Sequence, residues 1–213
     1  MAKKKQVKGV AEPSQSPDSD IFLVPAKAGE GKLTEKMSRF LSFARPVASA
    51  EEAREFVKNL QNEYHDARHV CWAYILGEEG VEYQLNDNGE PSGTAGRPIH
   101  GQIRSAGLTN VCVAVVRYFG GIKLGTPGLI AAYKESARLA LEDAGSKECC
   151  RQSSLWVEFP YEDMGIVMKL VKAMSLEVYG REIDNISRIG VRFPRSRGKE
   201  VRERLEKVGK VED

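Results

Sequence analysis

Two glycine-rich connections contain most of the residues in this sequence that could do chemistry. The first reads NDNGEPSGTAGRPI, from Asn86 to Ile99, and the second reads GGIKLGTPG, from Gly120 to Gly128. Each connection lies between an expected strand and an expected helix. Successive glycines let a backbone approach a ligand closely, and the N-terminus of a helix favours an anion. The two connections could therefore share a phosphate or carboxylate site.

The residues expected at this site form two walls of a cleft. One wall is expected to contain Asp87, Glu90, Ser92, Thr94 and Arg97. The other is expected to contain Arg117, Tyr118, Gly120, Gly121, Lys123, Gly125 and Thr126. In this hypothesis the cations bind the anion and the two carboxylates orient those cations. The alternative is that the glycines fit tight turns and that the polar side chains cap loop N–H groups or pair with the arginines.

Known phosphate-binding motifs do not match either connection. In the second connection, Gly120 and Gly125 have the spacing of a P-loop, but Thr126 stands where that motif needs lysine. The first connection does not fit the G-x-G-x-x-G pattern. The anion site is therefore a hypothesis from residue types and not from a motif.

Catalysis and metal binding have weaker support. Asp87 and Glu90 could form a carboxylate pair, but spacing in a loop does not fix their separation. His69 and Cys71 alternate along an expected strand and could form a Cys/His pair, or they could be core residues with a hydrogen-bonded imidazole. His65 and His69 have the spacing of one helical face, but no third ligand is evident. We expect no catalytic residue, no metal and no cofactor.

A basic stretch near the C-terminus is the candidate for contact with nucleic acid. RIGVRFPRSRGK contains five cations and no acid, namely Arg188, Arg192, Arg195, Arg197 and Lys199. Such a segment can contact phosphates, or it can be a solvated edge that prevents sheets from aggregating. The formal net charge of the chain is only +2, so any nucleic-acid contact must use a local patch. Nearby aromatic residues are scarce, which favours backbone contact over sequence readout.

The elements that position these residues have clear signals. Ser49 and Glu52 form a capping box that predicts the start of an amphipathic helix. The apolar run NVCVAVVRYF predicts a central strand buried on both faces. Thr126 as N-cap, followed by Pro127, predicts a long helix that ends at Gly145. HVCWAYIL and VEYQL, on either side of GEEG, predict a hairpin.

Composition and element order predict two domains after a tail. Residues 1–20 are polar and predict a flexible tail. Residues 21–148 form the expected N-terminal domain. Residues 151–213 have the order strand, helix, strand, strand, helix, which predicts a small α+β sandwich. The four cysteines lack zinc-finger spacing, and no signal peptide or membrane span is evident, so we expect a cytoplasmic protein with reduced thiols.

Two long motifs resemble the IMPACT/YigZ family. They are DNGEPSGTAGRPI and VVRYFGGIKLGTPGLIAAY, while DARHVCWAYILG and SRFLSFARPV fit the pattern upstream. The resemblance covers residues 21–145 and extends more weakly to the small C-terminal domain of bacterial members. It implies an α+β fold with a first domain similar to the second domain of a ribosomal small-subunit protein and to domain IV of elongation factor EF-G. The second domain would be ferredoxin-like, as in domain V of EF-G. Pro127 departs from the family pattern and removes one N–H from the proposed anion site.

The resemblance implies a non-catalytic regulator of translation that binds RNA, the ribosome or a translation-factor protein, and no membrane. Eukaryotic members bind the activator of a starvation-sensing kinase, a role associated with an extra N-terminal domain that we do not expect here. One alternative is an enzyme that acts on a phosphorylated small molecule or nucleotide in the glycine-rich cleft. Another alternative is a protein-interaction module.

Overall fold

The computed structural model describes the backbone of residues 6–10 and all of residues 20–213. The chain divides into two compact units. Unit 1 contains Phe22–Cys149, and unit 2 contains Cys150–Asp213 together with residues 20–21. Most of the expected flexible tail lies outside the described residues. Within it, however, strand β1 (Gln6–Val10) pairs antiparallel with β6 (Glu82–Asn86), because the edge of the sheet offers unpaired backbone groups. Composition alone did not predict this strand.

Unit 1 contains a six-stranded sheet in the order β1-β6-β5-β7-β4-β3, and every neighbouring pair is antiparallel. The remaining strands of this sheet are β3 (Gly29–Glu35), β4 (Ser38–Pro46), β5 (His69–Leu76) and β7 (Val111–Tyr118). A separate two-stranded sheet joins β2 (Ile21–Pro25) to β8 (Ser146–Cys150). The hairpin predicted from sequence is the β5–β6 pair.

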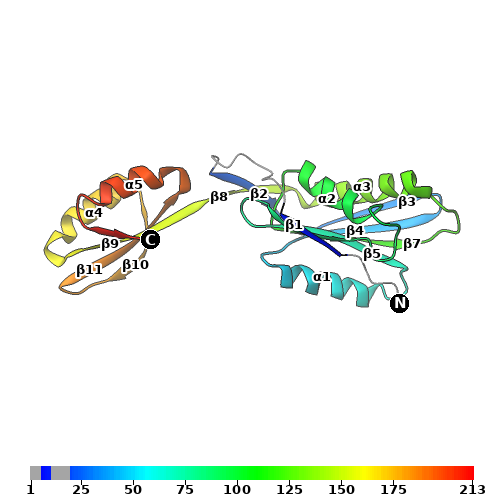
Figure 1. Cartoon of the computed structure of the whole chain (residues 1–213), viewed down its shortest axis with the longest axis horizontal. Helices are drawn as coiled ribbons and strands as arrows, with labels where there is room; N and C mark the ends of the chain where they lie inside the picture. The colour runs from blue at the N-terminus through cyan, green and yellow to red at the C-terminus, as the bar shows by residue number, and fades with distance from the viewer. Residues whose placement is uncertain (1–5, 11–19) are drawn as a thin grey trace. The chain divides into compact units, whose positions relative to one another are not determined.

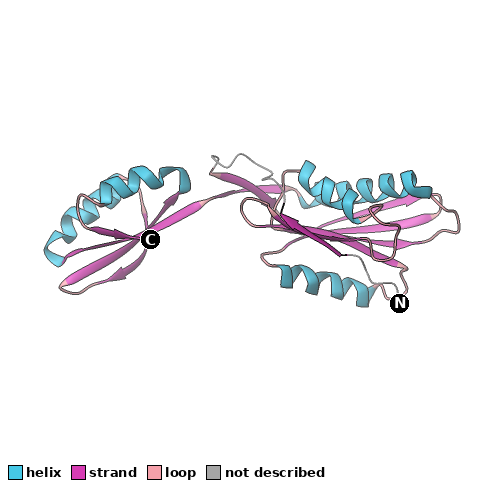
Figure 2. Cartoon of the chain, in the orientation of Figure 1, coloured by secondary structure: helices cyan, strands magenta, loops and turns pink. Residues whose placement is uncertain are grey.

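Three helices cover the two faces of this sheet (Figures 1 and 2). Helix α1 (Ala50–Glu63) lies on one face, and α2 (Gly96–Ser105) and α3 (Gly125–Ala144) lie on the other. Alternate residues of β7 therefore enter different cores. Val113 and Val115 pack with α2 and α3, and Ala114 packs with α1. By the same alternation Arg117 points to the α3 face and Tyr118 to the α1 face.

The ends of two helices were largely predicted. Ser49 caps α1 by accepting the N–H of Glu52 at 3.2 Å, and Gly145 ends α3 with a φ of 60°. The start of α3 differs from the prediction, because the helix begins at Gly125 and Leu124 is its N-cap. Thr126 is therefore a helical residue and not the cap. No side chain caps this N-terminus, and that matters for the site.

Unit 2 is a ferredoxin-like sandwich. Its sheet has the order β10-β11-β9-β12 and is antiparallel throughout. Its elements are β9 (Gln152–Pro160), η1 (Tyr161–Asp163), α4 (Met164–Ala173), β10 (Glu177–Glu182), β11 (Ile186–Pro194), η2 (Arg195–Arg197), α5 (Gly198–Leu205) and β12 (Lys210–Glu212). Both helices pack on one face, through Val167, Val171, Val201 and Leu205. The α+β class predicted for both units is confirmed. The last strand has only three residues, too few to leave a pattern in the sequence.

Candidate functional site

The first connection folds upon itself around Asp87. Its carboxylate accepts the N–H of Gly93 at 2.8 Å on one oxygen, and those of Ala95 at 3.0 Å and Gly96 at 2.8 Å on the other. These groups precede and begin α2, so Asp87 closes the loop and caps the helix. The prediction that Asp87 contacts a ligand is therefore corrected, because its acceptor positions face the loop backbone.

Other polar residues of the first connection also serve the loop or point to solvent. The hydroxyl of Thr94 is buried and donates to the carbonyl of Pro91 at 2.7 Å. Ser92 and Arg97 are exposed, and neither lines the cavity described below. Thr94, Ser92 and Arg97 therefore do not form the predicted wall of a cleft. Of that wall, only Glu90 faces the cavity.

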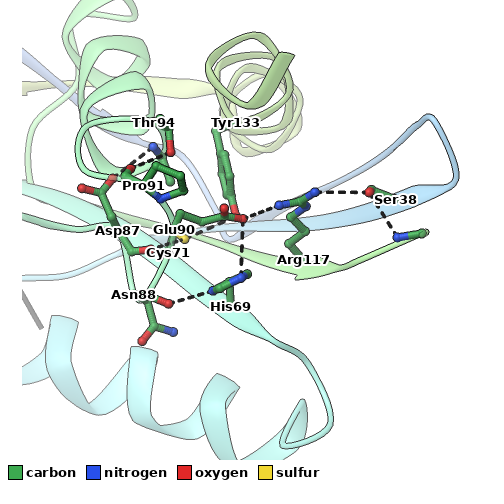
Figure 3. Close-up of polar contacts among 12 residues, drawn as sticks. Ser38, His69, Cys71, Asp87, Asn88, Glu90, Pro91, Thr94, Arg117 and Tyr133 are labelled. Carbon is green, nitrogen blue, oxygen red and sulfur yellow. Dashed lines mark hydrogen bonds and ion pairs between the residues drawn. The ribbon is translucent and has the colours of Figure 1, made fainter. Parts of the chain in front are cut away.

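Glu90 and Arg117 form a buried ion pair (Figure 3). The Arg117 Nη1 lies 2.6 Å from Glu90 Oε1, and the side chains are 7% and 4% exposed. The same oxygen accepts the hydroxyl of Tyr133 at 2.9 Å. The second terminal nitrogen of Arg117 donates to Ser38 at 3.4 Å. This pairing is the alternative that the sequence left open.

The guanidinium of Arg117 lies against two aromatic rings. Its central carbon is 5.5 Å from the ring centroid of Phe40 and 5.7 Å from that of Phe119. These distances are those of cation–π contacts. Its Nε is buried without a hydrogen-bond partner. Arg117, which was predicted to contact a ligand, is thus largely engaged within the protein, although it also lines the cavity described below. Arg117 positions Glu90 and Phe119, and only its Nε is left without a partner.

His69 and Cys71 do not form a Cys/His pair. The Cys71 thiol donates to the carbonyl of Asp87 at 3.0 Å, and burial raises the pKa of this thiol well above its usual value. His69 Nδ1 lies 2.9 Å from the carbonyl of Asn88. Because a carbonyl only accepts, Nδ1 carries the proton in this contact. The other ring nitrogen of His69 is 3.9 Å from Glu90 Oε1, so the imidazole is directed to Glu90 (Figure 3).

A cavity of about 450 Å³ separates this buried network from the second connection. Of the predicted residues it is lined by Glu90, Arg117, Lys123, Gly125 and Thr126. His69, considered above only for a Cys/His pair or a metal, also lines it. The sequence did not single out several other lining residues, among them Arg68, Phe119, Leu124 and Leu129. The volume falls in the range of small-ligand sites, roughly 300–1,000 Å³.

The electrostatics of this cavity favour an anion. Lys123 and Arg68 are exposed cations at its wall. The uncapped N-terminus of α3 opens onto it at Gly125 and Thr126, and its free N–H groups carry a partial positive charge. Glu90 is the carboxylate in the lining, and Arg117 neutralises it. The cavity can therefore accept a phosphate or a carboxylate.

Tyr118, Gly120 and Gly121 lie outside the cavity lining. The hydroxyl of Tyr118 donates to Asp66 at 2.8 Å on the α1 face. Gly120 donates its N–H to Ser38 at 3.2 Å, and a Cβ on Gly120 would lie 2.0 Å from the backbone of Met37. Gly121 has a φ of 90° and serves the turn. The prediction that these residues contact the ligand is corrected, because strand alternation and backbone packing direct them elsewhere.

The basic stretch of unit 2 is interleaved with acids from neighbouring strands. Arg188 lies 2.8 Å from Glu212 and 3.6 Å from Glu182. Arg192 lies 3.7 Å from Glu177. The segment is free of acids in sequence, but β11 pairs with β10, and β12 pairs with the next strand, β9, so carboxylates of β10 and β12 lie beside it. These ion pairs argue against an open phosphate-binding surface. The alternative of a sheet edge is corrected for Arg188 and Arg192, because β11 lies between β10 and β9.

Some cations in the last part of this stretch also make contacts within the protein. Arg197 donates to the carbonyl of Met174 at 2.9 Å and pairs with Glu200 at 3.3 Å. Arg195 and Lys199 are exposed. The five cations are therefore not a uniform set of available charges.

Metal binding finds no supporting geometry among residues 20–213. Within this described part of the chain, no three His, Cys, Asp or Glu side chains come together as a metal site. His65 follows the end of α1 and His69 begins β5, so they do not share a helical face. In the same described part, no helix is long and apolar enough to span a membrane.

These features define a two-unit α+β protein with a cavity of about 450 Å³ in its first unit, lined by cations and by the N-terminus of α3. The family model of the Impact N-terminal domain matches residues 36–141. An IMPACT family member of Thermus thermophilus is 38% identical over 157 residues, which cover 74% of this chain and 84% of that protein. The chain belongs to the IMPACT family.

Two further comparisons bear on extent and fold. The IMPACT family member YvyE of Bacillus subtilis is 41% identical over 127 residues, which cover 60% of this chain and 58% of YvyE. The chain thus spans little more than half the length of that relative. A crystal structure described as that of a hypothetical protein is 26% identical, covers 88% of this chain and 92% of its own, and has a TM-score of 0.64. This likeness supports the two-unit fold.

Proposed function

We propose that this protein is a non-catalytic regulator of translation that binds RNA through the cavity of unit 1. The observation that carries the proposal is the uncapped N-terminus of α3 beside Lys123 and Arg68, in a cavity whose carboxylate is already paired. Translation enters through membership of the IMPACT family, whose eukaryotic members are regulators of translation. The ribosome is one RNA-containing partner that a regulator of translation could bind.

A phosphate group suits this cavity for two physical reasons. Backbone N–H groups at a helix start donate to phosphate oxygens without a side-chain ordering cost. A lysine acts as a point charge toward phosphate, and the Lys123 side chain is exposed and available. The carboxylate that lines this cavity is already engaged within the protein. Glu90 accepts from Arg117 and Tyr133, which supports binding and not catalysis.

The salt dependence of RNA binding tests this proposal. Affinity for single-stranded RNA and for ribosomal RNA should fall steeply between about 50 and 200 mM salt, because bound phosphates displace counterions. Lys123→Ala should weaken binding to all sequences and lower the salt slope by about 1. Lys134→Ala is the matched control, because Lys134 is an exposed lysine of α3 outside the cavity lining. Absence of measurable binding to RNA or ribosomes at low salt would reject the proposal.

A phosphorylated small molecule is the second candidate ligand. The observation in its favour is that the anion-binding groups line a cavity of about 450 Å³ and not a flat surface. A ligand that binds only the folded state raises the unfolding temperature as its concentration rises. Thermal stabilisation by a mononucleotide, without any binding of RNA, would favour this candidate over the first.

A further inference from the structure

Three large apolar side chains are exposed on the second connection and on the turn beside it, and one of them, Phe119, lines the cavity. Met37 is 69% exposed, Ile122 is 49% exposed and Phe119 is 44% exposed. Met37 lies in the β3–β4 turn, and the other two belong to the second connection. The close packing of Gly120 on the backbone of Met37 holds the two segments side by side. We refer to Met37, Phe119 and Ile122 as the apolar rim.

The β3–β4 connection is a two-residue hairpin turn, with Glu35 and Ser38 paired on either side of it. Lys36 and Met37 both have positive φ, at 43° and 64°, as the two central residues of a type I′ turn do. The turn therefore holds an exposed methionine at its tip.

The ring of Phe119 is fixed from one side. The guanidinium of Arg117 lies 5.7 Å from its centroid, and that guanidinium is itself held by Glu90 and Ser38. The remaining exposed surface of the ring borders the cavity that also contains Lys123. One face of the Phe119 ring is thus held by the Arg117 guanidinium, and the rest of the ring lies at the cavity that contains Lys123.

We infer that the second connection binds one unstacked nucleotide of single-stranded RNA. The base stacks on Phe119, the aromatic member of the apolar rim, and a phosphate lies at Lys123 and the N-terminus of α3. One nucleotide supplies both the planar ring and the anion that this surface suits. This inference rests on the proposed function and adds to it the form of RNA and the residue that recognises it.

Stacking predicts a preference for single strands. In a duplex the bases are already stacked on one another, so their faces are not available to a protein side chain. Aromatic stacking is tolerant of sequence, because every base has a π-face. The site should therefore bind many single-stranded sequences and should gain little from Phe119 when it meets a duplex.

The test uses the full chain with a short labelled oligouridylate and an RNA duplex of equal length. Phe119→Ala should lower affinity for the single strand about tenfold and leave the salt slope unchanged, because no charge is removed. Phe119→Tyr should retain affinity. Ile130→Ala is the matched control, since Ile130 is an exposed apolar residue of α3 outside the cavity lining. A thermal melt of each variant confirms folding.

Several results would overturn this inference. If the wild-type protein binds RNA and Phe119→Ala binds equally well, then the stacking site is wrong and the proposed function stands. Equal losses for single strand and duplex would also reject stacking. Competition by uridine monophosphate as effective as the oligomer would assign the site to a free nucleotide. Stronger competition by an acidic peptide than by RNA would assign it to a protein partner. If no RNA binds at all, both proposals fail together.

Discussion

The two glycine-rich connections of unit 1 are similar in composition and opposite in what they do. In the first, Asp87 accepts three backbone N–H groups of its own loop and Thr94 donates within it. In the second, no side chain caps α3, and Lys123 and Phe119 remain exposed. The first connection is a closed structural unit, and the second presents its polar groups outward. Glycine and polar content identify such loops, but the partners of each polar atom decide their role.

The buried ion pair that joins the two regions should give the largest effect on stability. Arg117→Ala should lower the free energy of unfolding by about 3–5 kcal/mol, because it leaves the Glu90 carboxylate buried without its cation. Denaturant unfolding measures the change. The double variant Arg117→Met with Glu90→Gln should lose less than Arg117→Ala alone, since no charge is left unpaired. A fully stable Arg117→Ala protein would show that this arginine serves the ligand and not the fold.

The next largest effect should come from the closed connection. Asp87→Ala should lower the free energy of unfolding by about 2–4 kcal/mol, because the N–H groups of Gly93, Ala95 and Gly96 lose their acceptor. Asp87→Asn should lose less, since one amide oxygen can still accept. The same denaturant experiment applies. If Asp87→Ala were as stable as wild type but bound RNA poorly, the contrast between the connections would be wrong.

Gly120 tests whether the second connection depends on its anchor at the β3–β4 turn. Gly120→Ala should cost about 1–3 kcal/mol, because its Cβ would lie 2.0 Å from the Met37 backbone and one of the two segments must move. Gly101→Ala is the control, because Gly101 lies in α2 with nothing within 4 Å of an added Cβ. Calorimetric unfolding compares them. Equal stability of the two variants would show that the second connection does not need this contact.

The smallest expected effect is a pH dependence of stability that arises in α2, the helix at the end of the first connection. Desolvation, with a further contribution from Arg104, lowers the pKa of His100 below its ordinary 6.5. The unfolded state therefore binds the proton more readily, so the stability linked to His100 is retained above about pH 6.5 and falls as the pH drops toward the folded-state pKa. His100→Gln should unfold with a weaker dependence between about pH 6.5 and pH 5. An unchanged dependence would assign the titration to another group.

Much of the fold was predictable because its signals are local. The span predicted for β5 from HVCWAYIL is the observed one, and the capping box at Ser49 and the stop at Gly145 depend on neighbours within a few residues. The strand, helix, strand, strand, helix order of unit 2 followed from local patterns, and its ferredoxin-like form was implied by the family resemblance. Four strands were not predicted, namely β1, β3, β8 and β12. Of these, β1 and β12 are short edge strands that are defined by their pairing and not by a sequence pattern.

The site was less predictable because its contacts join distant parts of the chain. Glu90 and Arg117 are 27 residues apart, and Tyr133 is 43 residues from Glu90. The sequence left open whether Glu90 lies at a ligand site or pairs with an arginine, and it did not indicate a role for Tyr133. A tyrosine on the buried face of α3 was the available signal, because a buried phenol usually finds a hydrogen-bond partner. The acids that face Arg188 come from other strands, so no local pattern could reveal them.

The most direct measurement of the central claim is a nuclear magnetic resonance titration of the backbone amides with single-stranded RNA. If the second connection binds RNA, the largest changes in chemical shift should occur at the amides of residues 119–126, at the start of α3 and the connection before it. The amides of Gly93, Ala95 and Gly96 should change little, because Asp87 already holds them. Changes concentrated at residues 93–96, or confined to unit 2, would contradict it.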